Sequence, residues 1–159
     1  MSEPDPLKPH SHDPNPEPPT ADPTLKLTTP EGAQHLVTVE ELQGDYTAVT
    51  IPNCYIVSTG HGTSGPFAFT GVRLLDLVQH YAGGHSWRQV EVVSADGFGN
   101  RVLVAELYEP DPAGPILLAY RLDNVLLTRQ QGLVRMIVPS EKDDALRQVK
   151  WVDVVRIRP

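Results

Sequence analysis

The sequence predicts a single α+β domain that is mainly β, with one main helix. The 159 residues are 40% hydrophobic, which is enough apolar material for one core. The hydrophobic period switches repeatedly along the chain, and only one stretch keeps the helical period long enough for a substantial helix. Because many short strands accompany that helix, we expect a β-rich sheet rather than a doubly wound parallel one.

Residues 1–24 are expected to be a disordered, acidic tail. They hold eight of the sixteen prolines and almost nothing apolar, so burial would not offset the entropy lost on ordering. The segment lacks the basic start and apolar core of a signal peptide, and no stretch of the sequence has the length of a membrane span. A cytoplasmic protein is the resulting expectation. His10 and His12 could contact a metal, although on such a segment histidines are more often solvated polar residues.

The domain itself is expected to begin at residue 25. Short strands are predicted at LKL and HLVTV, and Thr38 is a suitable cap for one helical turn, VEELQ, that ends at Gly44. Residues 47–57 have the pattern of a strand. The main helix is predicted at 72–82, before the pair Gly83-Gly84. Its apolar stripe consists of Leu74, Leu75, Leu77, Val78 and Tyr81.

The remainder of the chain is expected to form five strands. They lie at 88–95, 100–104, 116–121, 134–138 and 148–157. The turn ADGFGN joins the first two as a hairpin, and LDN at 122–124 signals another turn.

Charge is unevenly distributed in this acidic chain, whose net charge is −7. Residues 121–159 carry eight bases and five acids, so the C-terminal quarter is locally basic. The chain as a whole is too acidic for a general nucleic-acid binder, and a small anion is the better-suited ligand. The single cysteine, Cys54, excludes an internal disulfide and fits a reducing compartment.

The connector STGHGTSGP, residues 58–66, is unusually rich in glycine and hydroxyl side chains. Glycines let a backbone approach a ligand closely, and the amides and hydroxyls are donors suited to an oxyanion. The alternative is a long turn whose hydroxyl groups satisfy its own backbone. The segment matches neither a phosphate-binding Walker loop, nor a dinucleotide fingerprint, nor a serine hydrolase elbow.

Two cations lie within apolar strands near the C-terminus. Arg135 begins one strand, and Lys150 lies between Val149 and Trp151 in another. A cation in such a position needs an anion or a path to water. Each could be an ordinary strand-edge residue, but together with Arg147 they form a candidate anion clamp.

Five segments occur in an order that resembles a known family: VEEL, FTGVRLLDLV, VEVVSADGFG, ILLAYRLDNVLLTRQQGLVRMIVP and VKWVDVVRI. The sequence resembles the sulfite-oxidase-type oxidoreductase molybdopterin-binding domain over residues 25–159. The most specific pieces are RMIVP with VKWV, and FTGVRLLDL. The resemblance implies a mixed, mainly β domain that holds a molybdenum pterin through its phosphate tail and pterin ring.

The resemblance also assigns site residues. Asp96 matches an acid that contacts the pterin, and Arg135 matches an arginine that begins the strand after a glycine. The segment that closes over the cofactor corresponds to Gln148, Val149 and Lys150. This chain has Gln131 before its glycine, where the family often has a histidine, so one pterin contact is altered. The expected wall of the pterin pocket, with His61 as a candidate polar contact, consists of Ser58, Thr59, Gly60, His61, Gly62 and Thr63.

Two alignments with the family are possible, and they place different residues at the position of the metal ligand. In the family a cysteine thiolate ligates molybdenum, and a thiolate is a soft ligand that suits this metal. Alignment on the loop glycine puts Ser58 or Thr59 at that position, whereas a longer loop would restore Cys54 as the ligand. Cys54 and Ser58 are about 13 Å apart along an extended strand, so both cannot occupy the site.

Two functions are compatible with these observations. The first is a molybdopterin-dependent oxidoreductase that performs oxygen-atom transfer or a two-electron reduction. Its electrons would come from a redox partner protein or from a pair of substrates. The second is a non-catalytic module on the same fold that binds a pterin, another anion or a protein and has lost the metal thiolate.

Overall fold

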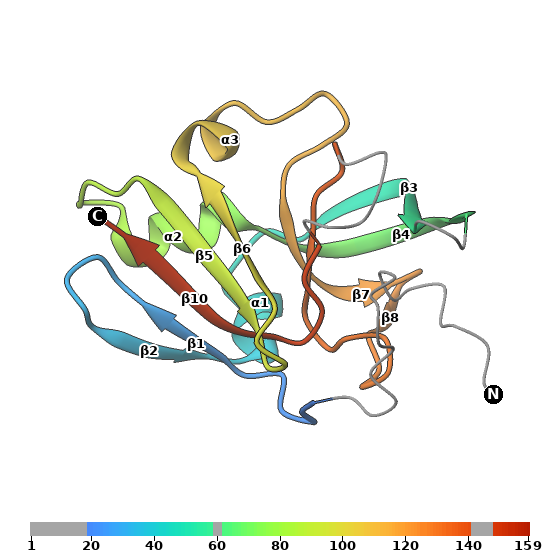
Figure 1. Cartoon of the computed structure of the whole chain (residues 1–159), viewed down its shortest axis with the longest axis horizontal. Helices are drawn as coiled ribbons and strands as arrows, with labels where there is room; N and C mark the ends of the chain where they lie inside the picture. The colour runs from blue at the N-terminus through green and yellow to red at the C-terminus, as the bar shows by residue number, and fades with distance from the viewer. Residues whose placement is uncertain (1–18, 59–61, 141–147) are drawn as a thin grey trace.

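The structure is a computed structural model that describes residues 19–58, 62–140 and 148–159. The described residues form ten strands and three helices, arranged around two five-stranded sheets (Figure 1). The expected α+β class, mainly β with one main helix, is confirmed. No helix in these three ranges is long and apolar enough to cross a membrane.

Sheet A is a mixed sheet. It contains β1 (Leu25–Thr28), β2 (Gln34–Val37), β5 (Gln89–Ser94), β6 (Gly99–Leu103) and β10 (Val152–Arg158). Their order is β2-β1-β10-β5-β6, so the last strand in the chain lies in the middle of the sheet. The β1–β10 pair is parallel and the other three pairs are antiparallel. The predicted hairpin at ADGFGN is the β5–β6 connection.

Sheet B is antiparallel throughout. It contains β3 (Val49–Ser58), β4 (Gly62–Arg73), β7 (Leu117–Leu122), β8 (Val125–Leu126) and β9 (Arg135–Ile137). Strands β3 and β4 form a long hairpin, and β7 pairs with β4 on one side and with β8 and β9 on the other. Gly71 lies where β7 approaches β4, and a Cβ atom there would collide with the backbone of Leu118. This strand pairing therefore requires a glycine.

Three helices accompany the sheets: α1 (Val39–Gly44), α2 (Leu74–Ala82) and α3 (Val104–Tyr108). The Thr38 side chain accepts a hydrogen bond from the Glu41 amide at 3.2 Å, so the predicted cap of the VEELQ turn is confirmed. Helix α2 buries Leu74 and Leu77 on its inner face.

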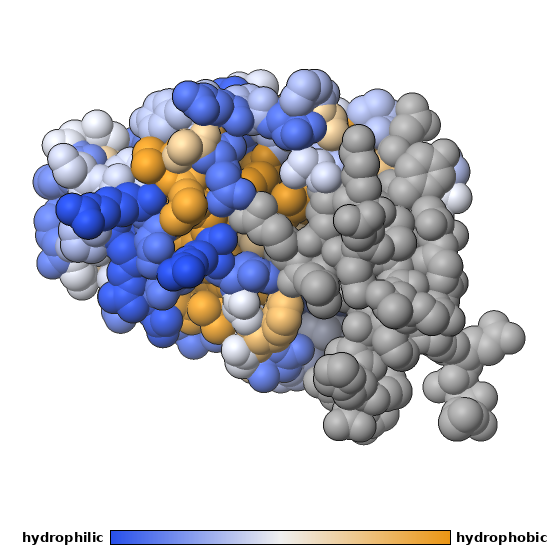
Figure 2. All heavy atoms as spheres, turned by 45° about the horizontal axis from the view of Figure 1, so that its top comes forward, coloured by the Kyte–Doolittle hydropathy of each residue, from blue (hydrophilic) through white to orange (hydrophobic). Residues whose placement is uncertain are grey.

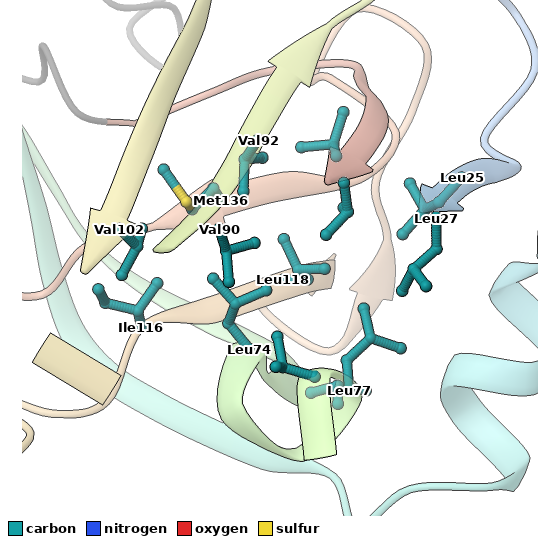
Figure 3. Packing of buried hydrophobic residues seen from close by; sticks show 14 of the residues in the cluster. Leu25, Leu27, Leu74, Leu77, Val90, Val92, Val102, Ile116, Leu118 and Met136 are labelled. Atoms are coloured by element: carbon teal, nitrogen blue, oxygen red, sulfur yellow. The ribbon is translucent and has the colours of Figure 1, made fainter. Parts of the chain in front are cut away.

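The main core lies between the two sheets and α2 (Figure 3). Sheet A contributes Leu25 and Val90, sheet B contributes Leu118 and Met136, and α2 contributes Leu77. A smaller cluster covers the other face of sheet B. It consists of Ile51, Cys54, Phe69, Leu117, Ala119, Leu122, Leu127 and Ile137.

Several element boundaries differ from the sequence-based expectation. Residues 62–66 were expected in a connector but begin β4, because backbone pairing such as Ile56 with Ser64 extends the hairpin through residues of weak strand propensity. The short elements α3 and β8 were not predicted. Strand β10 begins at Val152 rather than at 148, because Trp151 has a left-handed backbone with φ +50°.

One face of the molecule exposes hydrophobic side chains among hydrophilic ones (Figure 2). Large apolar residues with high exposure include Phe98 and Leu103, beside the two ends of β6, and Tyr108 at the end of α3. Scattered exposure of this kind is normal for a folded protein.

Candidate functional site

Three polar side chains near the C-terminus are almost completely buried. Arg135 is 0% exposed, Gln148 is 2% exposed and Lys150 is 5% exposed. Burial of a charge in a protein is unfavourable unless hydrogen bonds or an opposite charge compensate it. Two buried cations in one small domain therefore mark the first place to look for an anionic ligand.

Strand geometry brings these three side chains to one face of sheet B. Met136 and Val149 form an antiparallel bridge with hydrogen bonds in both directions, at 2.8 and 3.3 Å. Both pack in the main core, so their neighbours Arg135 and Lys150 lie on the opposite face, beside each other. Gln148 lies on that face by the same alternation. Its Oε1 atom has no hydrogen-bond partner among the described residues.

The turn formed by residues 128–133 is one wall of this site. Its own amides are organised around Thr128, whose carbonyl oxygen accepts from the amides of Gln131, Gly132 and Leu133 at 3.1 Å each. Three consecutive carbonyl oxygens of the turn accept hydrogen bonds from side chains of the site. Trp151 Nε1 donates to Arg129 O at 2.6 Å, Lys150 Nζ to Gln130 O at 3.1 Å, and Arg135 Nη1 to Gln131 O at 3.3 Å.

Gly132 makes the close packing of the two cations possible. Its φ is +111°, and a Cβ atom there would lie 3.0 Å from Arg135 Cγ and 3.1 Å from Lys150 Cβ. Any larger residue would push apart the stems of the two basic side chains and would also strain the backbone. The glycine thus sets the spacing of the two cations.

Trp151 is a site residue that the sequence reasoning did not single out. Its indole ring lies under the Lys150 ammonium, with Nζ 4.7 Å from the ring centroid. Its main-chain amide donates to Gly132 O at 2.8 Å, and its carbonyl accepts from the Ala95 amide at 2.9 Å. The residue was visible only as part of the VKWV motif, because nothing in a sequence shows a left-handed backbone at a tryptophan.

Arg135 connects the basic site to Cys54. Its guanidinium lies over the Phe69 ring, with Cζ 5.5 Å from the centroid, and Phe69 belongs to the same cluster as Cys54. Burial raises the pKa of the Cys54 thiol above its ordinary value, and the positive charge of Arg135 opposes part of that increase. Cys54 is therefore protonated at neutral pH. It lies close enough to Arg135 for the positive charge to affect its pKa.

The described residues of the connector, 58 and 62–66, lie farther along the β3–β4 hairpin than Cys54. Cys54 pairs with Phe67, whereas Ser58 pairs with Gly62 and Val57 with Thr63 at the end of the hairpin. Ser58 is four residues beyond Cys54, about 13 Å along an extended strand. Thr59, Gly60 and His61 lie outside the described residues, as do Arg147, His10 and His12.

Asp96 lies in the turn between β5 and β6. Its Oδ1 atom accepts from the Phe98 amide at 2.9 Å, and its side chain is exposed. The turn touches the site through the Ala95 to Trp151 hydrogen bond, so Asp96 is adjacent to the site rather than buried in it. Val149, by contrast, packs in the main core, on the opposite side of the segment 148–150 from Gln148 and Lys150.

Within the described ranges, no group of three or more histidine, cysteine, aspartate or glutamate residues could hold a metal ion. The site instead contains two buried cations, the side-chain amide of Gln148 and the carbonyl oxygens of the turn, with one thiol nearby. Such donors suit an anionic organic ligand with phosphate groups, since arginine and lysine both bind phosphate oxygens.

Comparison with known proteins identifies the family and the fold of the chain. The model of the oxidoreductase molybdopterin binding domain matches residues 28–159. The sulfane dehydrogenase SoxCD from Paracoccus pantotrophus has a similar structure, with a TM-score of 0.66 and 17% sequence identity. The match covers 85% of this chain and 38% of that one, so it shows a shared fold over well under half of the SoxCD chain. No curated protein matches. The family match spans most of the sequence, and the chain belongs to the oxidoreductase molybdopterin-binding domain family.

Proposed function

We propose that this chain binds an anionic molybdopterin cofactor at the site formed by Arg135, Gln148 and Lys150 around Gly132. The observation that carries the proposal is the burial of two cations and an amide on one face of sheet B. A domain that needed only stability would gain little from such groups, since desolvation offsets most of what buried charges contribute.

The side chains present fit this class of cofactor. Arg135 would bind phosphate oxygens through its guanidinium fork, and Lys150 would contribute a point charge beside it. The Oε1 atom of Gln148, which has no partner within the described residues, would accept from an N–H group of the pterin ring. When bound, a molybdenum pterin supplies two-electron redox chemistry such as oxygen-atom transfer. The chain's residues bind it, orient it and exclude water.

We further propose Cys54 rather than Ser58 as the thiolate that meets the metal. The supporting observation is position, because Cys54 lies in the cluster that Arg135 reaches, whereas Ser58 is near the hairpin end. A cysteine must be deprotonated to bind a metal. The raised pKa of Cys54 opposes deprotonation unless a metal ion binds to the sulfur. Metal binding to Cys54 would therefore release a proton.

The same raised pKa favours a second candidate function, a module that binds the pterin or another anion without metal. In that case Cys54 remains a buried thiol in an apolar cluster. An oxidoreductase of this type would also need a redox partner protein or a pair of substrates, whereas a binding module would not.

The experiment is a measurement of molybdenum and pterin per chain, on protein produced in a host that makes the cofactor. Elemental mass spectrometry gives the metal, and fluorescence of the released, oxidised pterin gives the organic part. We expect both near one per chain in the wild type, and loss of both in Arg135→Met and Lys150→Met. Arg156→Met, which removes an exposed cation of β10, is the matched control and should retain both.

Cys54→Ala separates the two candidate functions. Loss of molybdenum with retention of pterin would support Cys54 as the metal ligand. Pterin without metal in the wild type would select the binding module. Wild-type protein that carries neither component would overturn the proposed cofactor site.

A further inference from the structure

Trp151 joins the three segments that surround the candidate site. Its indole Nε1–H donates to Arg129 O in the 128–133 turn, and its amide donates to Gly132 O in the same turn. Its carbonyl accepts from Ala95, in the turn that carries Asp96. It also directly follows Lys150 in the chain. In the described part of the structure, Trp151 connects the 128–133 turn, the segment 148–150 and the β5–β6 hairpin.

The Lys150 ammonium contacts both the Trp151 indole and the turn that Trp151 holds. On one side is the indole face, 4.7 Å away, and on another is Gln130 O, 3.1 Å away. Tryptophan gives the strongest attraction of any aromatic side chain for a cation at its face. A lysine side chain is otherwise flexible, with a long stem and a compact charge, so these two contacts fix where the charge lies.

The backbone of Trp151 is in an unusual conformation for such a residue. Its φ of +50° lies in the left-handed region, which bulky residues rarely adopt. The hydrogen bonds Trp151 N to Gly132 O and Val152 N to Val134 O, at 2.8 and 2.9 Å, hold the chain there. This twist interrupts the strand between Lys150 and Val152. It therefore lets the indole of Trp151 lie beside the side chain of its own neighbour, where a regular strand would place the two on opposite faces.

We propose that Trp151 is a positioning residue for anion binding: it fixes the Lys150 ammonium so that this charge is presented to a phosphate-type ligand in one place. The proposal rests on the proposed anion site and adds the residue that orients its lysine. Trp151 acts through Lys150, and its value for binding should disappear when Lys150 is absent.

The test is a double-mutant cycle in ligand affinity, measured on the full chain. Inorganic pyrophosphate is the probe, and isothermal titration calorimetry at low ionic strength gives its dissociation constant. Trp151→Leu removes both the ring face and the indole donor, whereas Trp151→Phe keeps a ring. Each is measured alone and in a Lys150→Met background. Trp87→Leu, at a tryptophan that stacks on Tyr108 away from Lys150, is the matched control.

We expect Trp151→Leu to weaken pyrophosphate binding about tenfold, from the strength of a desolvated cation–π contact, and Trp151→Phe to weaken it less. In the Lys150→Met background, both Trp151 changes should alter the affinity for pyrophosphate by less than about twofold. A residue that acts only through Lys150 has no effect on binding once that lysine has been removed. Trp87→Leu should bind as the wild type does. Circular dichroism and urea unfolding confirm that each variant is folded, and Trp151→Phe keeps the test decisive if Trp151→Leu does not fold.

Two results overturn the positioning role alone. One is a loss of the same size with and without Lys150, which would make Trp151 a general structural residue. The other is unchanged affinity in folded Trp151 variants. A wild-type chain that does not bind pyrophosphate would instead overturn the anion site, and the positioning role with it.

Discussion

Replacement of Gly132 by alanine tests whether the two buried cations really pack against this glycine. Two effects act at this position. A residue with a Cβ at φ +111° carries backbone strain of about 1–3 kcal/mol. The new methyl group would also lie 3.0 to 3.2 Å from the stems of Arg135 and Lys150. Because both stems are buried, relief of this crowding would require rearrangement, which adds about 1–3 kcal/mol.

The sum is a destabilisation of about 2–6 kcal/mol, a large part of the 5–15 kcal/mol that typically holds a domain folded. Gly97→Ala is the matched control. Gly97 has a similar backbone, with φ +94°, but no atom lies within 4 Å of its missing Cβ. That variant therefore reports the backbone strain alone, and the difference between the two variants isolates the packing against Arg135 and Lys150.

The assay is urea unfolding followed by circular dichroism. At a slope of about 2 kcal/mol per M, each additional 1 kcal/mol lowers the midpoint by about 0.5 M. We expect the midpoint of Gly132→Ala to fall below that of Gly97→Ala by at least this amount. Equal midpoints for the two variants would refute the account of Gly132 as the spacer between the cations.

Three further predictions concern the cap, the thiol and the core. Thr38→Ala should lower the unfolding free energy by about 1 kcal/mol in urea unfolding, because the Glu41 amide loses its acceptor, and no change would contradict the cap. Burial raises the pKa of the Cys54 thiol above 9.0, so its contribution to stability is complete below pH 9 and is lost as pH rises further. Wild-type stability should therefore fall more steeply above pH 9 than that of Cys54→Ala, and parallel pH profiles would contradict this. Leu118→Ala should destabilise by about 2–5 kcal/mol, whereas exposed Leu126→Ala should change stability little; equal effects would contradict the assigned core.

Local signals in the sequence predicted the parts of the fold that depend on neighbours in the chain. The Thr38 cap and the hairpin at ADGFGN both depend on interactions within a few residues. The apolar stripe of α2 is visible for the same reason, since it follows from the helical period. The first residues of β4 could not be predicted as a strand, because glycine, serine and threonine do not carry a strong strand pattern.

The arrangement of the candidate site could be predicted only in part. A cation in an apolar strand already marked Arg135 and Lys150 as unusual. Their placement side by side depends on the Met136–Val149 bridge and on the left-handed backbone of Gly132, and no local pattern contains this information. The proposal of Cys54 rather than Ser58 as the metal ligand likewise depends on strand register, which pairing across the hairpin determines rather than either strand alone.

The position of β10 in the middle of sheet A has a consequence for biosynthesis. While the ribosome is still making residues 152–158, β1 and β5 both lack the strand that will lie between them. Two open strand edges are exposed until then, and such edges promote association between nascent chains. Pairing of β1 with β10 also joins segments more than a hundred residues apart, which slows folding. Chaperone contact with the nascent chain should accordingly persist until β10 emerges from the exit tunnel.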